Sequence, residues 1–176
     1  MTSGRTTKDP KRDALREAAM VHGLLLEREQ TVATAESLTG GRLGMLLTET
    51  PGSSATYVGG VVAYATRVKT ELLGVPASLV EAHGVVSAEC ALAMARGVRD
   101  LTGASYALST TGVAGPERQE GKPAGTVFLG VVGPDGVPSA LALELVGSRF
   151  EIRDRACAEA MSALAAMLVG KKPGLG

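Results

Sequence analysis

The stretch TVATAESLTGG, from Thr31 to Gly41, joins a short apolar strand to a glycine-rich turn that leads into a helix. Ser37 lies on this turn. A serine in such a place is exposed, close to backbone N–H groups and next to the positive end of the helix dipole, which are the surroundings of a nucleophile. The alternative is that Ser37 only caps the following helix, the commoner role of a serine there. Glu36 beside it either tunes the site or holds the turn through hydrogen bonds.

Strands and helices alternate on both sides of this turn. Apolar positions at helical spacing and short β-branched runs mark the expected elements. Helices are expected over about 13–29, 40–47, 66–73, 88–101 and 152–168, and strands over 31–35, 58–64, 105–110, 126–132 and 137–146. The turn GPDG joins the last two strands into an antiparallel hairpin. The pattern predicts an α/β protein, a three-layer α/β/α sandwich with a mixed, mostly parallel sheet of about five strands.

The chain has 176 residues, 45% of them hydrophobic and 20% charged, which is typical of one soluble globular domain. We expect this domain to span 13–170, after a disordered leader over 1–12 and before a flexible tail over 171–176. Apolar runs are too short for a secretory signal at the start or for the roughly 20 residues that cross a bilayer. The composition therefore argues against a membrane-spanning protein.

Charge and cysteine content restrict the classes of binding partner and the cellular compartment that we expect. Basic and acidic residues each number 18, so no global field favours nucleic acid or an anionic membrane, and neither is an expected partner. The two cysteines, Cys90 and Cys157, give no framework of paired cysteines, so we expect a reducing, cytoplasmic setting. His22 and His83 lack metal-ligand spacing to a second ligand, so no metal site is expected.

A second motif, YATRVK, runs from Tyr64 to Lys69 and offers a base for Ser37. Lys69 falls in the first turn of the expected helix, where the positive dipole end and partial burial would both lower its pKa from about 10.4. A lysine that is neutral near pH 7 can take a proton from a serine. The alternatives are a solvated lysine on a helix face and, for Tyr64, a tyrosine that anchors the edge of the core.

A third motif, STTGVAGP, from Ser109 to Pro116, places small residues after a predicted strand, where a ligand can approach the backbone closely. The polar loop ERQEGKPAG follows and is expected to close over a substrate. Ordinary turn glycines are the alternative. Because ligands of α/β sheets bind where strands end and helices begin, one pocket is expected to collect all three motifs.

Together these motifs resemble the C-terminal domain of the competence/damage-inducible protein CinA family. AESLTGG, YATRVK, STTGVAGP and KPAGTV occur in this order, and the resemblance covers about 28–169. It implies the same α/β/α fold with about five strands. Stand-alone members of the family are nicotinamide-nucleotide amidohydrolases, so the resemblance implies hydrolysis of nicotinamide mononucleotide to nicotinate mononucleotide and ammonia. It implies no cofactor.

The resemblance also implies roles for individual residues. Ser37 would attack the carboxamide, Lys69 would move the proton with Tyr64 assisting, and Thr111 would hold the oxyanion or the substrate. The catalytic set is therefore Ser37, Tyr64, Lys69 and Thr111, and the substrate-binding set is Thr39, Gly40, Gly41, Gly112, Gly115 and Arg149. Family members often carry GDR where this chain has Gly147, Ser148 and Arg149, a departure that bears on how Arg149 is oriented and on phosphate binding.

Two other functions stay open at this point. One is a non-catalytic nucleotide-binding or interaction module of the same fold, which the intact Ser37, Tyr64, Lys69 and Thr111 argue against and Ser148 mildly favours. The other is a serine amidase that acts on another small amide. The expected partner is a pyridine mononucleotide as substrate, and a homodimer is the default assembly for a small α/β enzyme.

Overall fold

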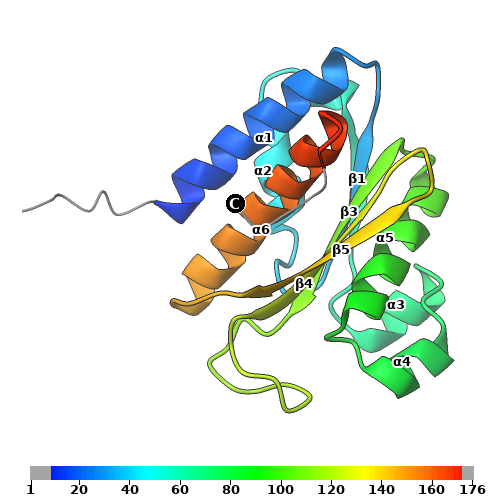
Figure 1. The fold of residues 1–176 in the computed structure, drawn as a ribbon, viewed down its shortest axis with the longest axis vertical. Coiled ribbons are helices and arrows are strands. Elements are labelled where there is room, and N and C mark those ends of the chain that lie inside the picture. The colour runs from blue at the N-terminus through cyan, green and yellow to red at the C-terminus, as the bar shows by residue number, and fades with distance from the viewer. Residues whose placement is uncertain (1–8, 172–176) are drawn as a thin grey trace, which may run out of the picture.

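A central β-sheet organises the protein, which a computed structural model describes over residues 9–171 (Figure 1). Its strands lie in the order β2-β1-β3-β4-β5. They are β1 (Val32–Glu36), β2 (Tyr57–Val62), β3 (Tyr106–Gly112), β4 (Thr126–Val132) and β5 (Pro138–Glu144). β1 pairs in parallel with β2 and β3, whereas β4 pairs antiparallel with β3 and β5. The mixed five-stranded sheet and the β4–β5 hairpin confirm the expectation.

Helices cover both faces of the sheet, which confirms the three-layer α/β/α sandwich (Figure 1). One face carries α1 (Pro10–Leu26), α2 (Arg42–Thr48) and α6 (Arg149–Leu168). The other carries α3 (Thr66–Glu71), α4 (Ala77–His83) and α5 (Ala88–Thr102). Because β2, β1 and β3 run in parallel, their carboxyl ends meet at one edge of the sheet, where the turns into α2 and α3 begin.

The core consists of two hydrophobic clusters, one on each face of the sheet. Successive side chains of a strand point to opposite faces, so the buried strand β1 contributes to both. Val32 packs in the cluster with α1 and α6, whereas Ala33 and Ala35 pack in the cluster with α5. β1 is buried at all five positions, as expected for a central strand covered on both sides. This burial fixes the place from which the glycine-rich turn emerges.

Several element boundaries differ from the expected ones. α1 begins at Pro10 with Asp9 as its N-cap, so 10–12 are helical although they were expected in a disordered leader. The rest of that leader, 1–8, and most of the expected tail, 172–176, lie outside the described residues. α4 was not expected, because none of its residues is buried and it shows no apolar stripe to the sequence pattern.

The boundaries of α5 and the state of the cysteines follow the expectation more closely. Ser87 caps the N-terminus of α5 by accepting from the N–H of Cys90, and Gly103 closes the helix with φ 69°. Cys90 and Cys157 are both buried and unpaired. Over residues 9–171, no helix combines the length and the apolar character that a membrane span needs.

Candidate active site

The structure brings Ser37 and Lys69 together. Ser37 follows β1, and Lys69 lies on α3, which follows the neighbouring strand β2. The Nζ atom of Lys69 is 3.0 Å from the Oγ atom of Ser37, a hydrogen-bond distance. The backbone N–H of Ser37 donates to the carbonyl of Thr110 at 2.9 Å, which extends the β1–β3 ladder by one residue and fixes the serine.

Lys69 is buried, with 1% of its surface exposed. Its Nζ donates to the carbonyl oxygens of Ala63 at 2.6 Å and Tyr64 at 3.3 Å. Burial lowers the pKa of Lys69 from its usual value, and this outweighs Cys90 and Glu120, which act to raise it. The three acceptors around Nζ match the three N–H donors of an ammonium, and a neutral amine keeps the same contacts by accepting from the Ser37 hydroxyl.

The cause of this pKa shift differs from the expected one. We expected the positive end of a helix dipole to help lower the pKa of Lys69. However, α3 has only six residues and Lys69 lies in its last turn, where the dipole favours a cation. The shift therefore arises from burial. Thr66 also does not cap α3 with its side chain, because the N-cap is Ala65 and Thr66 is the first helical residue.

A cavity of about 420 Å³ opens above the Ser37–Lys69 pair. The loop after β3 contributes more of its wall than any other segment, and the rest comes from the end of β3, the turns after β1 and β2, α3, the segment before α5 and the start of α6. The lining residues are Ser37, Leu38, Tyr64, Thr66, Lys69, Val85, Gly112, Val113, Ala114, Gly115, Pro116, Glu117, Arg118, Gln119 and Arg149. The cavity thus unites the three motifs that follow strands.

Tyr64 and Arg149 lie in the same cavity but bind each other rather than Ser37. The Tyr64 side chain is exposed, and its hydroxyl accepts from an Arg149 guanidinium nitrogen at 3.3 Å. Arg149 also donates to the carbonyl of Gly115 at 2.7 Å. Only the backbone carbonyl of Tyr64 meets Lys69. The structure therefore places the phenol beside Arg149 and the pocket loop, with no hydrogen bond to Ser37 or Lys69.

Thr111 and Thr39 do not line the cavity. The Thr111 hydroxyl is buried on the α5 side of the sheet, where it donates to the carbonyl of Val85 at 2.6 Å. The Thr39 hydroxyl is fully buried and donates to the carboxylate of Glu36 at 2.7 Å. Both hydroxyls are thus engaged in hydrogen bonds within the protein next to the cavity.

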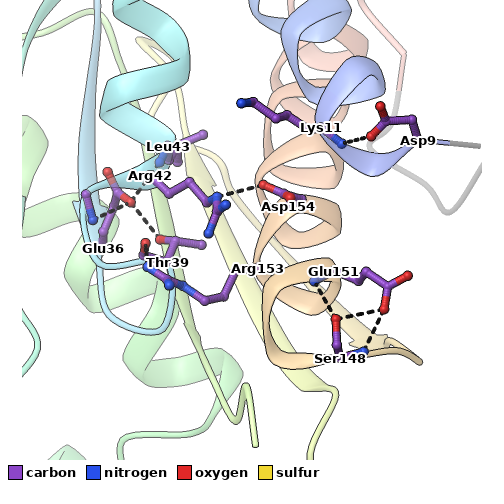
Figure 2. Close-up of polar contacts among 11 residues, drawn as sticks. Asp9, Lys11, Glu36, Thr39, Arg42, Leu43, Ser148, Glu151, Arg153 and Asp154 are labelled. Atoms are coloured by element: carbon purple, nitrogen blue, oxygen red, sulfur yellow. Dashed lines mark hydrogen bonds and ion pairs between the residues drawn. The ribbon is translucent and has the colours of Figure 1, made fainter.

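Glu36 holds the turn that carries Ser37. Its carboxylate is 2% exposed and accepts from the backbone N–H groups of Gly41, Leu43 and Gly44 at 2.8–3.0 Å. Figure 2 shows this carboxylate facing Thr39 and the start of α2. An anion at a helix N-terminus is favourable because it satisfies N–H groups that have no partner within the helix. Of the two roles open to Glu36, the structure assigns the structural one.

Two glycines shape the same turn. Gly40 and Gly41 have φ values of 59° and 94°, which other residues adopt only with strain, and α2 begins after them at Arg42 rather than at Gly40 as expected. Neither glycine lines the cavity. Their conformations shape the turn in which the N–H groups of residues 38–41 lie. Gly40 N–H donates to the Ser37 carbonyl and Gly41 N–H to Glu36, whereas in the described chain the N–H groups of Leu38 and Thr39 have no acceptor.

The start of α6 explains the sequence departure at Ser148. The Ser148 side chain accepts from the N–H of Glu151, and the Glu151 carboxylate accepts in return from Ser148, a capping box (Figure 2). Serine and aspartate are both good N-caps, so the replacement keeps the helix start intact. Arg149 is consequently held as the first residue of α6, directed at Gly115 and Tyr64.

Three polar contributors to the site were not among the expected residues. Glu117, Arg118 and Gln119 line the cavity from the loop that was expected to close over a substrate. Arg153 from α6 donates to the carbonyl of Thr39 at 2.7 Å, next to an Arg42–Asp154 ion pair of 2.6 Å (Figure 2). Polar residues between two glycine motifs were the signal for the loop. Arg153 was expected, with Arg149 and Lys122, as a cationic contact for a mononucleotide at the pocket rim, but neither Arg153 nor Lys122 lines the cavity. In the part of the chain that is described, no three His, Cys, Asp or Glu side chains gather as metal ligands would.

Comparison with known protein families agrees with this architecture. A family model described as the CinA C-terminal domain matches residues 15–168. A CinA-like protein from Frankia casuarinae is 50% identical over 151 residues, which make up 86% of this chain and 35% of that protein. A CinA-like protein from Gemmatimonas aurantiaca is 49% identical over 148 residues, 84% of this chain and 34% of that protein. The chain spans about a third of the length of these curated relatives.

Solved structures show the same fold. A competence-damaged protein (CinA) superfamily member from Klebsiella pneumoniae superposes with a TM-score of 0.86 at 32% identity, covering 89% of this chain and 98% of that one. A competence/damage inducible protein from Agrobacterium tumefaciens gives a TM-score of 0.83 at 32% identity, covering 90% and 94%. With the family model matching nearly the whole described chain, this protein belongs to the CinA C-terminal domain family.

Proposed function

We propose that this protein is an amidohydrolase that converts nicotinamide mononucleotide and water into nicotinate mononucleotide and ammonia. The observation that carries the proposal is the buried Lys69, whose Nζ lies 3.0 Å from the Oγ of Ser37 at a cavity of about 420 Å³. Burying a lysine is unfavourable unless the neutral amine is used, and a neutral amine next to a serine makes that serine a nucleophile. Membership of the CinA C-terminal domain family supports the same reaction.

The first half of the reaction forms an ester on Ser37. Neutral Lys69 accepts the hydroxyl proton as Oγ attacks the carboxamide carbon, and the carbonyl oxygen becomes an oxyanion. The free N–H group of Leu38, which lines the cavity, is the donor offered to this oxyanion. The Lys69 ammonium then gives its proton to the amide nitrogen, the C–N bond breaks, and ammonia leaves.

The second half reverses the proton path. A water molecule attacks the ester carbon while Lys69 takes one of its protons, and a second tetrahedral intermediate forms. The ester C–O bond breaks, and Lys69 returns the proton to the Oγ of Ser37. The product is the carboxylic acid, and the enzyme is restored without a cofactor. The carbonyls of Ala63 and Tyr64 hold Nζ in place during both transfers.

The cavity wall supports a mononucleotide as substrate. Its volume lies within the usual range for small-molecule sites. Arg118 and Arg149 both line it and bring guanidinium groups, which bind phosphate with directed hydrogen bonds. Arg149 already bonds Gly115 and Tyr64, so it also ties the pocket loop to α6. We propose that the Tyr64 phenol assists the reaction indirectly, by holding the Arg149 guanidinium through this hydrogen bond.

Ammonia release tests the proposal. The purified protein is incubated with nicotinamide mononucleotide, nicotinamide riboside and free nicotinamide, and ammonia is measured for each. We expect rapid release from the mononucleotide and slow release from the other two, because only the mononucleotide offers a phosphate to the guanidinium groups. Release that is fastest from another amide would indicate a serine amidase of different specificity. Binding of the mononucleotide without release from any amide would indicate a non-catalytic nucleotide-binding module.

A further inference from the structure

The loop that walls the cavity ends in a tight hairpin. Gln119 and Lys122 exchange backbone hydrogen bonds of 3.1 and 2.9 Å. Between them Glu120 and Gly121 have φ values of 50° and 72°. Positive φ at both central residues is the signature of a type I′ turn, in which asparagine, aspartate or glycine normally occupies the first position. A glutamate held in this conformation is unusual, and its side chain explains why it stays there.

The carboxylate of Glu120 reaches back to the body of the protein. One oxygen accepts from the backbone N–H of Val85 and the other from that of Val86, both at 2.9 Å. Hydrogen bonds to a charged acceptor are stronger than neutral ones, and a paired arrangement adds directional specificity. Lys122 also approaches this carboxylate, at 4.0 Å, but it makes no hydrogen bond with it.

The receiving segment, 84–86, is shaped for this contact. Gly84 has φ 76°, and a Cβ atom at Gly84 would lie 2.4 Å from an oxygen of Glu120. Val85 lines the cavity, and its carbonyl accepts from the Thr111 hydroxyl at 2.6 Å. Val85 is thus held through its N–H by the loop and through its C=O by β3. A change in the Glu120 contact therefore moves two walls of the cavity relative to each other.

The charge of Glu120 also acts on the base. The groups that face Lys69 electrostatically are Cys90 from α5 and Glu120 from the loop. Burial raises the pKa of the Cys90 thiol to about 11, so this group is uncharged near pH 7. Glu120 is therefore the negative charge that partly offsets the effect of burial on the pKa of Lys69.

We propose that Glu120 is a positioning residue of the active site, which holds the cavity wall at 115–119 against the segment 84–86 above Ser37 and Lys69. Its kinetic consequences rest on the proposed amidohydrolase function. The structural contact between Glu120 and the segment 84–86 does not depend on that function, so it is tested separately.

The first test is limited proteolysis of the folded protein with trypsin. Arg118 is exposed in the loop, next to the hairpin that Glu120 anchors. Glu120→Gln keeps the size of the side chain but offers one acceptor and an amide donor to two N–H donors, so we expect about tenfold faster cleavage after Arg118. Lys122→Gln is the matched control and should cleave at the wild-type rate. Intact mass spectrometry identifies the fragment, and a cooperative thermal transition checks the fold.

Gly84→Ala perturbs the same contact from the other side. The added methyl group displaces the Glu120 carboxylate without altering it, so cleavage after Arg118 should accelerate as in Glu120→Gln. Wild-type cleavage rates in both variants would overturn the proposal. This result does not depend on any enzymatic activity, so it separates failure of the inference from failure of the proposed function.

Kinetics of ammonia release provide the second test. In Glu120→Gln we expect KM for the mononucleotide to rise several-fold, because the wall that contacts the substrate is no longer fixed. The pH at which activity rises should move down, since removing a negative charge near Lys69 lowers its pKa further. An active wild type with unchanged KM and an unchanged pH profile in Glu120→Gln would overturn the positioning role. A loss of kcat caused only by unfolding would leave the pH profile where it was.

Discussion

At the residue scale, the protein keeps Lys69 buried although burial disfavours its charge. The cost is present wherever the lysine would be charged in the unfolded chain, and it disappears at high pH, where both states are neutral. Two backbone carbonyls and one hydroxyl satisfy the amine but supply no compensating negative charge. This combination has little value for stability and direct value for proton transfer, which is why we assign Lys69 as the base.

The protonation state of Lys69 gives the first prediction. Activity of the wild type should rise with pH through a pKa below that of an ordinary lysine, because burial lowers the pKa and only the neutral amine can accept a proton. Lys69→Arg should be inactive, because arginine does not deprotonate near neutrality. Initial rates of ammonia release between pH 5 and pH 10 provide the measurement. An active Lys69→Arg protein with the same profile would mean that Lys69 supplies only positive charge.

Arg149 gives the second prediction. Its guanidinium lines the cavity, so Arg149→Ala should weaken binding of the mononucleotide about tenfold and binding of the nucleoside far less. Tyr64→Phe is the matched control, because it removes the hydroxyl that Arg149 contacts and leaves the guanidinium in place. Isothermal titration with both ligands measures the effect. Equal losses for mononucleotide and nucleoside would place Arg149 outside the phosphate site.

Sequence motifs predicted that Ser37 and Lys69 lie together, which the structure shows, while their catalytic roles stay predictions. The motifs were less specific for the threonines. Ser37 and Lys69 are identified by chemical type within short motifs, and they do meet. Thr110 and Thr111 are neighbours on β3, so their side chains point to opposite faces of the sheet. Thr110 contacts Thr39 on the α2 side, and Thr111 contacts Val85 on the α5 side. The face of the sheet on which a side chain lies depends on strand register and packing, and a short sequence motif specifies neither.

At the element scale, the turn before α2 depends on a single carboxylate. Glu36 closes the N-terminus of α2 and fixes Thr39, so the turn that carries Ser37 keeps one shape. α6 supports the same turn from outside, through Arg153 and the Arg42–Asp154 ion pair. Ser37, the proposed nucleophile, is therefore positioned by a short strand, a capped helix and a neighbouring helix together.

Replacement of that carboxylate gives the third prediction. Glu36→Gln should lower the free energy of unfolding by about 2 kcal/mol, because the amide presents a donor to buried N–H groups that need an acceptor. Glu49→Gln, in an exposed position at the other end of α2, is the control and should stay within about 0.5 kcal/mol of wild type. Urea unfolding monitored by circular dichroism measures both. A stability for Glu36→Gln equal to that of the control would show that the turn does not depend on the carboxylate.

The helix boundaries show which local sequence signals predict where a helix begins and ends. The expected helix 88–101 matches α5 closely, because its N-cap Ser87 and its C-cap Gly103 are signals that act through nearby backbone atoms. The start of α2 was placed too early, because Gly40 and Gly41 adopt left-handed conformations. α4 was missed because a seven-residue helix that packs only Leu79 and Val80 against the core, and buries no residue fully, gives little periodic pattern.

At the scale of the whole molecule, the site depends on how closely the layers approach. β1 and β3 lead into the cavity, which Ser37 and Gly112 line. On the other face of the sheet, α5 packs against the segment that follows α3. Gly97 on α5 permits this approach, because a Cβ atom there would lie 1.9 Å from the carbonyl oxygen of Leu73. The close approach of α5 to the segment that follows α3 thus depends on the absence of a side chain at Gly97.

Gly97→Ala gives the fourth prediction. The methyl group would collide with backbone, so we expect a loss of about 1–3 kcal/mol in stability and a reduced rate, because the segment carrying Lys69 must shift. Gly23→Ala is the matched control on α1, where a Cβ atom meets nothing within 4 Å. It should gain about 0.5–1 kcal/mol with unchanged activity. Thermal unfolding and ammonia release measure both, and equal behaviour of the two variants would contradict the packing argument.

The overall fold was predictable because it follows from the alternation of strands and helices and from the GPDG turn, which are properties of the whole pattern. The close approach at Gly97 was not, because the partner atom belongs to Leu73, far along the chain. The same holds for Glu120, whose partners Val85 and Val86 precede it by more than thirty residues. Long-range contacts of this kind appear only when the layers are assembled.

The most direct test of the central claim is the rate of ammonia release from nicotinamide mononucleotide by Ser37→Ala. The variant should fold, because the Ser37 side chain is bonded only to Lys69 among the described residues, and its thermal transition provides that check. Turnover should fall by at least ~100-fold, because among the described residues no other side-chain hydroxyl is hydrogen-bonded to Lys69, the proposed base. Release at a rate within a few fold of wild type by a folded Ser37→Ala protein would contradict the account.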